Sequence, residues 1–286
     1  LESAENETTC TFRLAPPDMA GEGTLRALFV SKDGQRAPAF SRQRIDYPHI
    51  EPQTLISSAE AKLVRAKIEN KARHIGYIPG AGDAVPESLR EIGSEVKILS
   101  DAEMKAPNLA QFDAVVLGVR AYNVHPDRIS AWYPELLAYA QQGGVVVVQY
   151  NTTPGPKPNE LPHPLHVSHD RVTDETAPVR ILAPDHPVMN FPNKIGPEDF
   201  SGWVQERGLY FPDQWDPAWT PILSSHDPNE KPLEGGLLVA RVGKGWFVYT
   251  GYSWFRELPA GVPGAYRIFA NLISLGKSGQ SDRALR

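Results

Sequence analysis

Apolar residues gather in short runs along the middle of the chain. Four of these runs have the length of one buried strand: 74–79, 95–99, 112–119 and 145–150. Helical patterns lie between them at 83–92, where Asp83 is a candidate N-cap, and at 129–142, which ends at Gly143-Gly144. Continuous apolar runs alternating with helices are typical of a parallel sheet covered on both faces. The pattern therefore predicts a doubly wound α/β domain with a mostly parallel, flavodoxin-like sheet.

Further along, the residues from 151 to 236 are rich in proline and show no clear period, so we expect long loops there. Strands are predicted at 237–241 and 246–250, on either side of a glycine-containing turn, and a helix at 264–275. We assign residues 59–278 to the α/β domain and residues 279–286 to a tail.

Residues 1–58 form a different kind of segment. Strand-like stretches at 8–14 and 24–31 are joined by a Pro/Gly turn, and residues 32–34 form another turn. Two readings stay open: a short N-terminal β arm, or the end of a β-sandwich domain. A strand at 62–68 follows the linker. Because no initiator Met is present, we expect a processed chain or a piece of a longer one.

Composition narrows the classes of function. The chain has 286 residues and a net charge of −5, with no dense run of basic residues, so we expect no nucleic-acid partner. Its longest apolar run, Val145 to Val148, is far shorter than the roughly 20 residues of a membrane-spanning helix. The single cysteine, Cys10, allows neither an intrachain disulfide nor a thiolate zinc site.

A ligand of an open α/β sheet binds beyond the carboxyl ends of the strands. That rule selects polar residues after four of the predicted strands: Gly80, Asp83, Arg120, Tyr122, Asn123, Asn151, Thr152, Arg256 and Glu257. Arginines, amides and aromatic side chains suit a polyhydroxylated or carboxylated ligand. Structural roles compete with this reading, because Asp83 can cap its helix, Asn151 can form a turn, and Arg256 with Glu257 can be an exposed pair.

Several stretches carry a resemblance to known families. Asp185-His186-Pro187-Val188, followed by Glu206, Leu209 and Tyr210, resembles a pattern of the trehalose-utilisation (ThuA-like) branch of the class I glutamine amidotransferase-like superfamily, over residues 72–276. Six other stretches resemble the C-terminal region of bacterial PIG-L (LmbE-like) N-acetylglucosaminyl deacetylases: residues 76–83, 120–123, 149–153, 171–175, 202–210 and 255–261.

The second resemblance implies an accessory domain of a deacetylase that processes polysaccharides or glycoconjugates. It adds Arg171, Glu206 and Arg207 to the candidate ligand-binding residues. It also implies an upstream deacetylase domain that binds zinc, whereas we expect no cofactor in this segment. A periplasmic or secreted location is expected on the same ground.

The residues needed for amidotransferase chemistry are missing. An amidotransferase places a nucleophilic cysteine on the sharp turn after the strand that here ends in Gln149-Tyr150, and this chain has Asn151 there. The expected His-x-Glu partner is replaced by Tyr252-Ser253-Trp254. We therefore expect no glutaminase activity.

Other catalytic patterns are incomplete. His125-Pro126-Asp127-Arg128 begins like a deacetylase zinc motif but has Arg in place of the second Asp. His163, His166 and His169 are weak metal candidates, because in an extended chain residues three apart face opposite ways. Neither Ser168 nor Ser253 lies in a Gly-x-Ser-x-Gly elbow.

We therefore expect a non-catalytic accessory domain that binds a carbohydrate or positions a substrate for the deacetylase. Loop tryptophans could stack on a sugar or belong to the core: Trp203, Trp215, Trp219 and Trp254. One alternative is an independent hydrolase of a sugar derivative, with Glu206, Asp185 or His186 as the weak catalytic candidates. Another is a purely structural docking domain.

Overall fold

The computed structural model describes residues 9–15 and 18–278. These residues divide into two units, 1–67 and 68–286, and the division falls after Lys67 rather than after Ser58. The predicted tail at 279–286 lies outside the described residues.

Unit 1 consists of three antiparallel strand pairs. β1 (Gly21–Arg26) pairs with β6 (Glu60–Arg65), β2 (Leu28–Val30) with β3 (Arg36–Pro38), and β4 (Phe40–Ile45) with β5 (Gln53–Ser58). The predicted strand at 8–14 is wrong for its described residues, which have no regular structure, and the segment at 24–31 is interrupted at Ala27. No side chain in the described part of this unit is buried.

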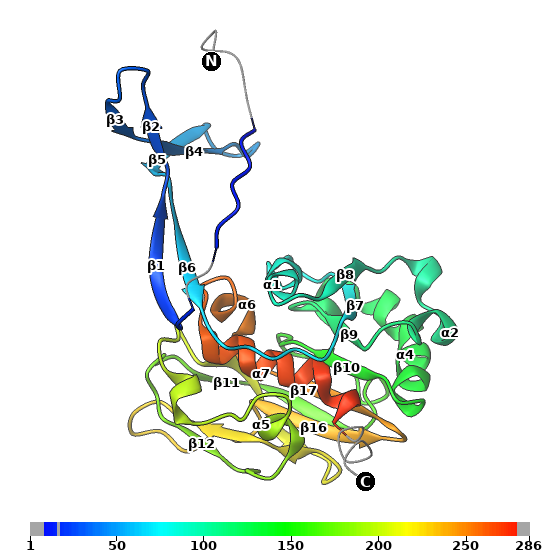
Figure 1. Cartoon of the computed structure of the whole chain (residues 1–286). Coiled ribbons are helices and arrows are strands. Elements are labelled where there is room, and N and C mark those ends of the chain that lie inside the picture. Colours follow the sequence, from blue (N-terminus) through cyan, green and yellow to red (C-terminus); the bar gives the residue numbers. More distant parts are fainter. Residues whose placement is uncertain (1–8, 16–17, 279–286) are drawn as a thin grey trace, which may run out of the picture. The chain divides into compact units, whose positions relative to one another are not determined.

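Unit 2 is an α/β domain built on a seven-stranded sheet, with the order β14-β16-β17-β10-β9-β7-β8 (Figure 1). Its parallel strands are β7 (His74–Ile78), β8 (Glu95–Ile98), β9 (Ala114–Leu117), β10 (Val145–Val148) and β17 (Gly245–Thr250). Numbered along the chain, they follow the 2-1-3-4-5 order of flavodoxin-like sheets. β16 (Leu237–Val242) and β14 (Thr220–Pro221) add an antiparallel edge. The predicted mostly parallel α/β sheet is therefore confirmed.

Helices cover both faces of this sheet. α1 (Val85–Glu91) and α7 (Pro263–Ser274) belong to one apolar cluster, and α4 (Pro126–Gln141) belongs to the other. Alternate residues of β10 serve the two clusters: Val145 and Val147 face α7, whereas Val146 and Val148 face α4. All four valines are fully buried, and burying each side chain contributes about 1.5–3 kcal/mol. The run of valines at 145–148 is thus the centre of the fold.

Short elements complete the parallel part of unit 2. α2 (Ala106–Leu109) and α3 (Ala121–Val124) flank β9, and α6 (Trp254–Glu257) follows β17. Among the described residues, no helix is long and apolar enough to cross a membrane.

The region from 151 to 236 contains more regular structure than the sequence predicts. β11 (Leu165–Val172) and β13 (Gly208–Trp215) form an antiparallel pair, and β12 (Val179–Ile181) pairs with β15 (Leu223–Ser225). α5 (Pro187–Asn190) lies between them. The expectation of loops alone is wrong because register shifts interrupt the β11–β13 ladder and blur its period of two, and Pro212 lies within β13.

Candidate functional site

The loops after β9 and β10 are joined by a set of hydrogen bonds at the carboxyl edge of the sheet. The Arg120 amide donates to the Tyr150 carbonyl (2.8 Å). The Asn123 side-chain amide donates to the Thr152 carbonyl (3.0 Å), and the Thr152 amide donates back to Asn123 Oδ1 (2.9 Å). The predicted site residues Arg120, Asn123 and Thr152 therefore lie close together. The two hydrogen bonds between Asn123 and Thr152 hold one loop against the other.

Asn151 occupies the turn after β10 and is completely buried. Its Oδ1 accepts from the Tyr122 amide (3.0 Å), and its Nδ2 donates to the Gln149 carbonyl (2.9 Å). Tyr122 is buried as well, and its hydroxyl donates to the Glu160 carbonyl (2.9 Å). Asn151 and Tyr122 thus stabilise the two loops, and the turn at which the sequence resemblance placed the missing nucleophile carries a buried amide.

Gly80 and Asp83 link the loop after β7 to the loop after β9. Asp83 Oδ1 accepts from the Tyr77 hydroxyl (2.5 Å) and the Val85 amide (3.1 Å), while Oδ2 accepts from the Val119 amide (3.2 Å). The residue at the N-cap of α1 is Ala84, one position later than predicted. A Cβ on Gly80 would lie 2.0 Å from the Val119 carbonyl oxygen, so only glycine fits this approach.

A group of aromatic and charged side chains lies beyond β10 and β17, and all of them except the buried Tyr150 are at least partly exposed. We call it the edge cluster and define it by these residues: Arg120, Tyr150, His169, Glu206, Tyr210, Phe255 and Arg256. The rings of Tyr150 and Tyr210 are stacked at 6.2 Å between centroids, Phe255 lies 5.2 Å from Tyr150, and His169 lies 5.7 Å from Tyr210. These four rings come from four separate parts of unit 2: the end of β10, β11, β13 and α6.

The charges of the edge cluster are partly paired. Arg256 Nε donates to Glu206 Oε1 (2.8 Å), and its guanidinium lies 4.9 Å from the Phe255 ring. Ser253 Oγ donates to the same carboxylate oxygen of Glu206 (3.3 Å). Burial raises the pKa of the Tyr150 phenol, while the positive charges of Arg120 and Arg256 act in the opposite direction. Both guanidinium groups therefore influence the Tyr150 phenol electrostatically.

Three residues at this edge have a left-handed backbone although they are not glycines. Arg120 has φ of 58°, Gln205 has φ of 66° and Tyr210 has φ of 54°. Each such conformation costs of order 1–3 kcal/mol, and such residues concentrate at functional sites. Gln205 Oε1 also accepts from Arg256 Nη1 (2.5 Å). The backbone strain thus coincides with the edge cluster.

Glu257 and Arg207 lie beneath the edge cluster and are buried. Arg207 donates from Nε and Nη2 to the Ala177 carbonyl (3.0 and 2.8 Å) and from Nη1 to the Phe200 carbonyl (2.6 Å), so it supports the surrounding loops. Glu257 Oε2 accepts from the Val204 amide (3.0 Å). Burial raises the pKa of Glu257 to about 7. Neither residue is an exposed ligand contact.

The weak catalytic candidates are not brought together. His186 is the N-cap of α5: its Nδ1 accepts from the Val188 amide (3.2 Å), and burial lowers its pKa. Its ring meets Trp246 at the start of β17, at 5.5 Å. Glu206 instead contacts Ser253 and Arg256, which follow the other end of β17. The geometry does not join His186 to Glu206, and Asp185 is exposed next to His186.

The three spaced histidines contact different partners along β11 and just before it. His163 meets Trp219 edge-on at 6.3 Å, His166 Nδ1 pairs with Asp213 Oδ1 at 2.6 Å, and His169 belongs to the edge cluster. Within the described ranges, no group of three or more His, Cys, Asp or Glu residues could hold a metal ion. Arg171 is exposed on β11 and makes none of the edge-cluster contacts given above.

The remaining catalytic patterns have structural partners. Ser168 Oγ donates to the Phe211 carbonyl (2.8 Å), and Arg128, at the start of α4, pairs with Asp101 (2.7 Å) and covers the Trp132 ring. Three of the four loop tryptophans belong to the core: Trp203, Trp219 and Trp254. Trp215 is only partly buried.

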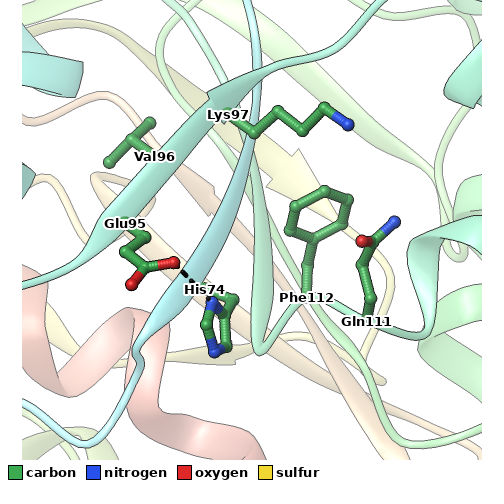
Figure 2. A pocket seen from close by; sticks show the side chains of 6 residues that line it. All are labelled: His74, Glu95, Val96, Lys97, Gln111 and Phe112. Carbon is green, nitrogen blue, oxygen red and sulfur yellow. Dashed lines mark ion pairs between the residues drawn. The ribbon is translucent and has the colours of Figure 1, made fainter.

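A hollow of about 430 Å³ lies at the opposite, amino edge of the sheet. Figure 2 shows its lining: His74 and Glu95 begin β7 and β8 and form an ion pair at 3.3 Å, with Lys97, Gln111 and Phe112 nearby. Because ligands of such sheets bind at the carboxyl ends of the strands, this hollow is not the favoured site.

Sequence reasoning missed several members of the edge cluster. It selected Arg120 and Arg256 from the rule of the carboxyl edge, and Glu206 from the family resemblance. It did not assign a ligand contact to Tyr150, Tyr210 or Phe255. All three lie inside the stretches that carry the resemblance, which was the available signal.

Comparisons with known proteins find similar folds only. No family model matches the chain, and no curated protein matches its sequence. A cytoplasmic protein from Salmonella typhimurium LT2 is 12% identical, with a TM-score of 0.46, and the match covers 83% of this chain and 95% of that one. A ThuA-like protein from Bacteroides uniformis is also 12% identical, with a TM-score of 0.45 and coverage of 74% and 93%.

The cold-adapted β-galactosidase from Rahnella sp. R3 is 15% identical, with a TM-score of 0.41, and the match covers 71% of this chain and 31% of the enzyme.

Proposed function

We propose that unit 2 is a non-catalytic, amidotransferase-like domain that binds a carbohydrate at the edge cluster. The observation that carries the proposal is the pair of partly exposed rings of Tyr210 and Phe255, which both pack on the buried ring of Tyr150, with Arg120 and the Arg256–Glu206 pair beside them. Aromatic side chains stack on the apolar face of a sugar ring. Guanidinium and carboxylate groups form hydrogen bonds with its hydroxyl groups, and guanidinium groups also bind acidic substituents.

The buried Asn151 supports the non-catalytic part of the proposal. The turn after β10 has no nucleophile, and both polar groups of the Asn151 side chain already serve the loops. Ser253 donates to Glu206 rather than to a histidine, so a serine nucleophile has no base in the contacts described for it. Because His186 lies beside Trp246, the independent hydrolase gains no support from this arrangement.

We further propose that this domain serves a PIG-L-type deacetylase acting on N-acetyl sugars, and that it belongs to the ThuA-like branch of its superfamily. The six stretches of sequence resemblance support this, and three of them supply Tyr150, Tyr210 and Phe255. The zinc of such an enzyme would belong to an upstream domain. Reading the coding sequence ahead of Leu1 tests the parentage, and a reading frame without a zinc-motif domain contradicts it.

Isothermal titration calorimetry on the full chain tests the binding itself. We expect saturable binding of a tetrasaccharide of N-acetylglucosamine, and a dissociation constant raised about tenfold by Arg120→Ala or Tyr210→Ala. Arg180→Ala is the matched control, because Arg180 is an exposed arginine on β12 that pairs with Glu234. The proposal is contradicted if both edge-cluster substitutions leave the dissociation constant unchanged. It is also contradicted if no amino-sugar oligosaccharide binds at millimolar concentration.

A further inference from the structure

A second hollow lies on unit 2 beside the β11–β13 pair, with a volume of about 460 Å³. Four prolines from the loop after β10 form much of its apolar wall: Pro154, Pro156, Pro158 and Pro164. Trp215, the last residue of β13, lines it with part of its ring exposed. The volume falls in the range of about 300–1,000 Å³ that holds small ligands.

Polar side chains surround this apolar wall, and hydrogen bonds hold two of them in place. His166, Gln214 and Asp216 line the hollow, and His166 Nδ1 is held by Asp213 Oδ1 at 2.6 Å. Asp216 is held in turn, because its Oδ1 accepts from the Ala218 amide (2.8 Å). An apolar surface with a few fixed polar groups is the usual composition of a small-molecule site.

We propose that this hollow is a second saccharide site, in which one sugar ring stacks on Trp215 while its hydroxyl groups bind His166, Gln214 and Asp216. The charged groups around it, an imidazole and the carboxylates of Asp213 and Asp216, favour neutral or basic sugars over acidic ones. The proposal relies on the proposed function only for the class of ligand, since it shares no residue with the edge cluster.

The tryptophan of the hollow differs from the other loop tryptophans in a way that supports a binding role. Trp203, Trp219 and Trp254 are 4%, 2% and 0% exposed, whereas Trp215 is only partly buried: one part of it packs against the core, and it also lines the hollow. A Cβ on Gly235 would lie 3.0 Å from the Trp215 ring, so this glycine backs the ring closely. A ring held from behind loses little freedom when a ligand stacks on its open part.

Nuclear magnetic resonance titration of the full chain tests the proposal. The indole N–H signal of Trp215 is assigned by its loss in Trp215→Phe, and the probes are cellotetraose, a glucosamine tetrasaccharide and a galacturonic acid tetrasaccharide. We expect the neutral and basic probes to shift this signal saturably and the acidic probe to leave it in place. Because Trp215→Ala removes the reporter indole, its dissociation constant for cellotetraose is measured by isothermal titration calorimetry, and we expect it to rise about tenfold. Trp246→Ala, at a partly buried tryptophan beside His186, should change it by less than about twofold.

The Arg120→Ala/Tyr210→Ala double variant separates the two sites. The Trp215 shift should persist in it, so a failure of the edge cluster to bind leaves this proposal standing. Loss of the Trp215 shift in that folded double variant, no shift with any saccharide, or a shift caused only by a proline-rich peptide would overturn the second site.

Discussion

The buried polar residues of the carboxyl edge decide what this site can do. Asn151 occupies the turn after β10, and its side-chain amide hydrogen-bonds to both neighbouring loops. Glu257 lies next to the charges of Arg207, Glu206 and Arg256 and is completely buried. At the scale of single residues, the turn after β10 carries a buried structural amide, and this is the arrangement on which we base the proposal of a non-catalytic domain.

The raised pKa of Glu257 predicts a pH dependence of stability. Its pKa is about 7 in the folded chain against an ordinary value of 4.5, so between these values the folded state holds a proton that the unfolded state has lost. The contribution of Glu257 to the free energy of unfolding should therefore fall as pH rises from about 4.5 to about 7 and stay low above that.

Urea unfolding at pH 5, 6, 7 and 8 measures this effect. We expect Glu257→Gln to unfold at a higher urea midpoint than the wild type at pH 8, and the difference to shrink toward pH 5. The exposed Glu230→Gln is the control, with no pH-dependent difference. A Glu257→Gln midpoint that differs from the wild type by the same amount at every pH contradicts the assignment.

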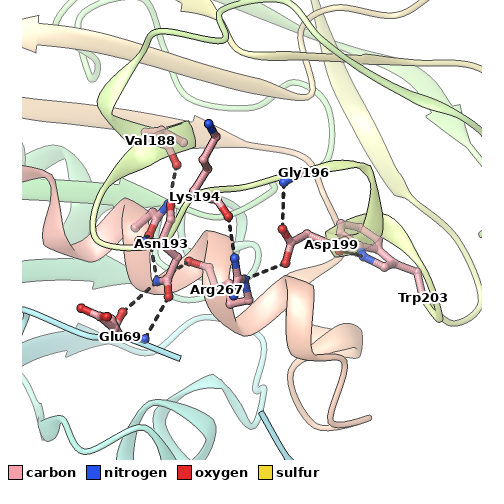
Figure 3. Close-up of polar contacts among 9 residues, drawn as sticks. Glu69, Val188, Asn193, Lys194, Gly196, Asp199, Trp203 and Arg267 are labelled. Carbon is pink, nitrogen blue, oxygen red and sulfur yellow. Dashed lines mark hydrogen bonds and ion pairs between the residues drawn. The ribbon is translucent and has the colours of Figure 1, made fainter. Parts of the chain in front are cut away.

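At the scale of elements, hydrogen bonds join α7 to α5 and to the segment that follows it. Asn271 of α7 is buried, and its Nδ2 donates to the carbonyls of Val188 and Asn193 (2.7 Å each), while its Oδ1 accepts from the Asn193 amide (2.9 Å). Figure 3 shows the neighbouring contacts. The Asn193 side chain accepts a hydrogen bond from the Glu69 amide and donates one to the Glu69 carbonyl, and Arg267 forms an ion pair with Asp199 (2.8 Å). One asparagine therefore serves three backbone groups.

Removing this asparagine should be costly. Asn271→Ala leaves buried amide and carbonyl groups without partners, and we expect the free energy of unfolding to drop by about 3 kcal/mol. Asn159→Ala, at an exposed residue of the loop after β10, should change it by less than about 0.5 kcal/mol. Chemical denaturation measures both, and equal effects would refute the role given to Asn271.

The elements also show how far sequence reasoning reached. The valine run at 145–148, the glycines that end helices and the apolar face of α7 predicted the central sheet because their patterns are local. β11 and β13 escaped prediction because their pairing joins residues about 40 apart through a ladder with register shifts. Tyr150, Tyr210 and Phe255 meet only through that pairing and the end of β17, so no local pattern could indicate the edge cluster.

At the scale of the whole molecule, the chain consists of two units that differ in how far their side chains are buried. Unit 2 has apolar clusters on both faces of its sheet, whereas the described side chains of unit 1 are exposed or partly exposed. The two surfaces proposed to bind saccharides both belong to unit 2 and differ in charge: arginines stand at the edge cluster, and carboxylates stand at the hollow beside Trp215. This difference predicts that one domain can recognise differently charged sugars.

A crystal structure of the full chain soaked with the N-acetylglucosamine tetrasaccharide tests the central claim most directly. The account predicts a sugar ring stacked against Tyr210 or Phe255, within hydrogen-bond distance of Arg120 or the Arg256–Glu206 pair. The account would be contradicted if a crystal soaked to saturation with this tetrasaccharide, with the edge cluster free of crystal contacts, showed no sugar on these residues.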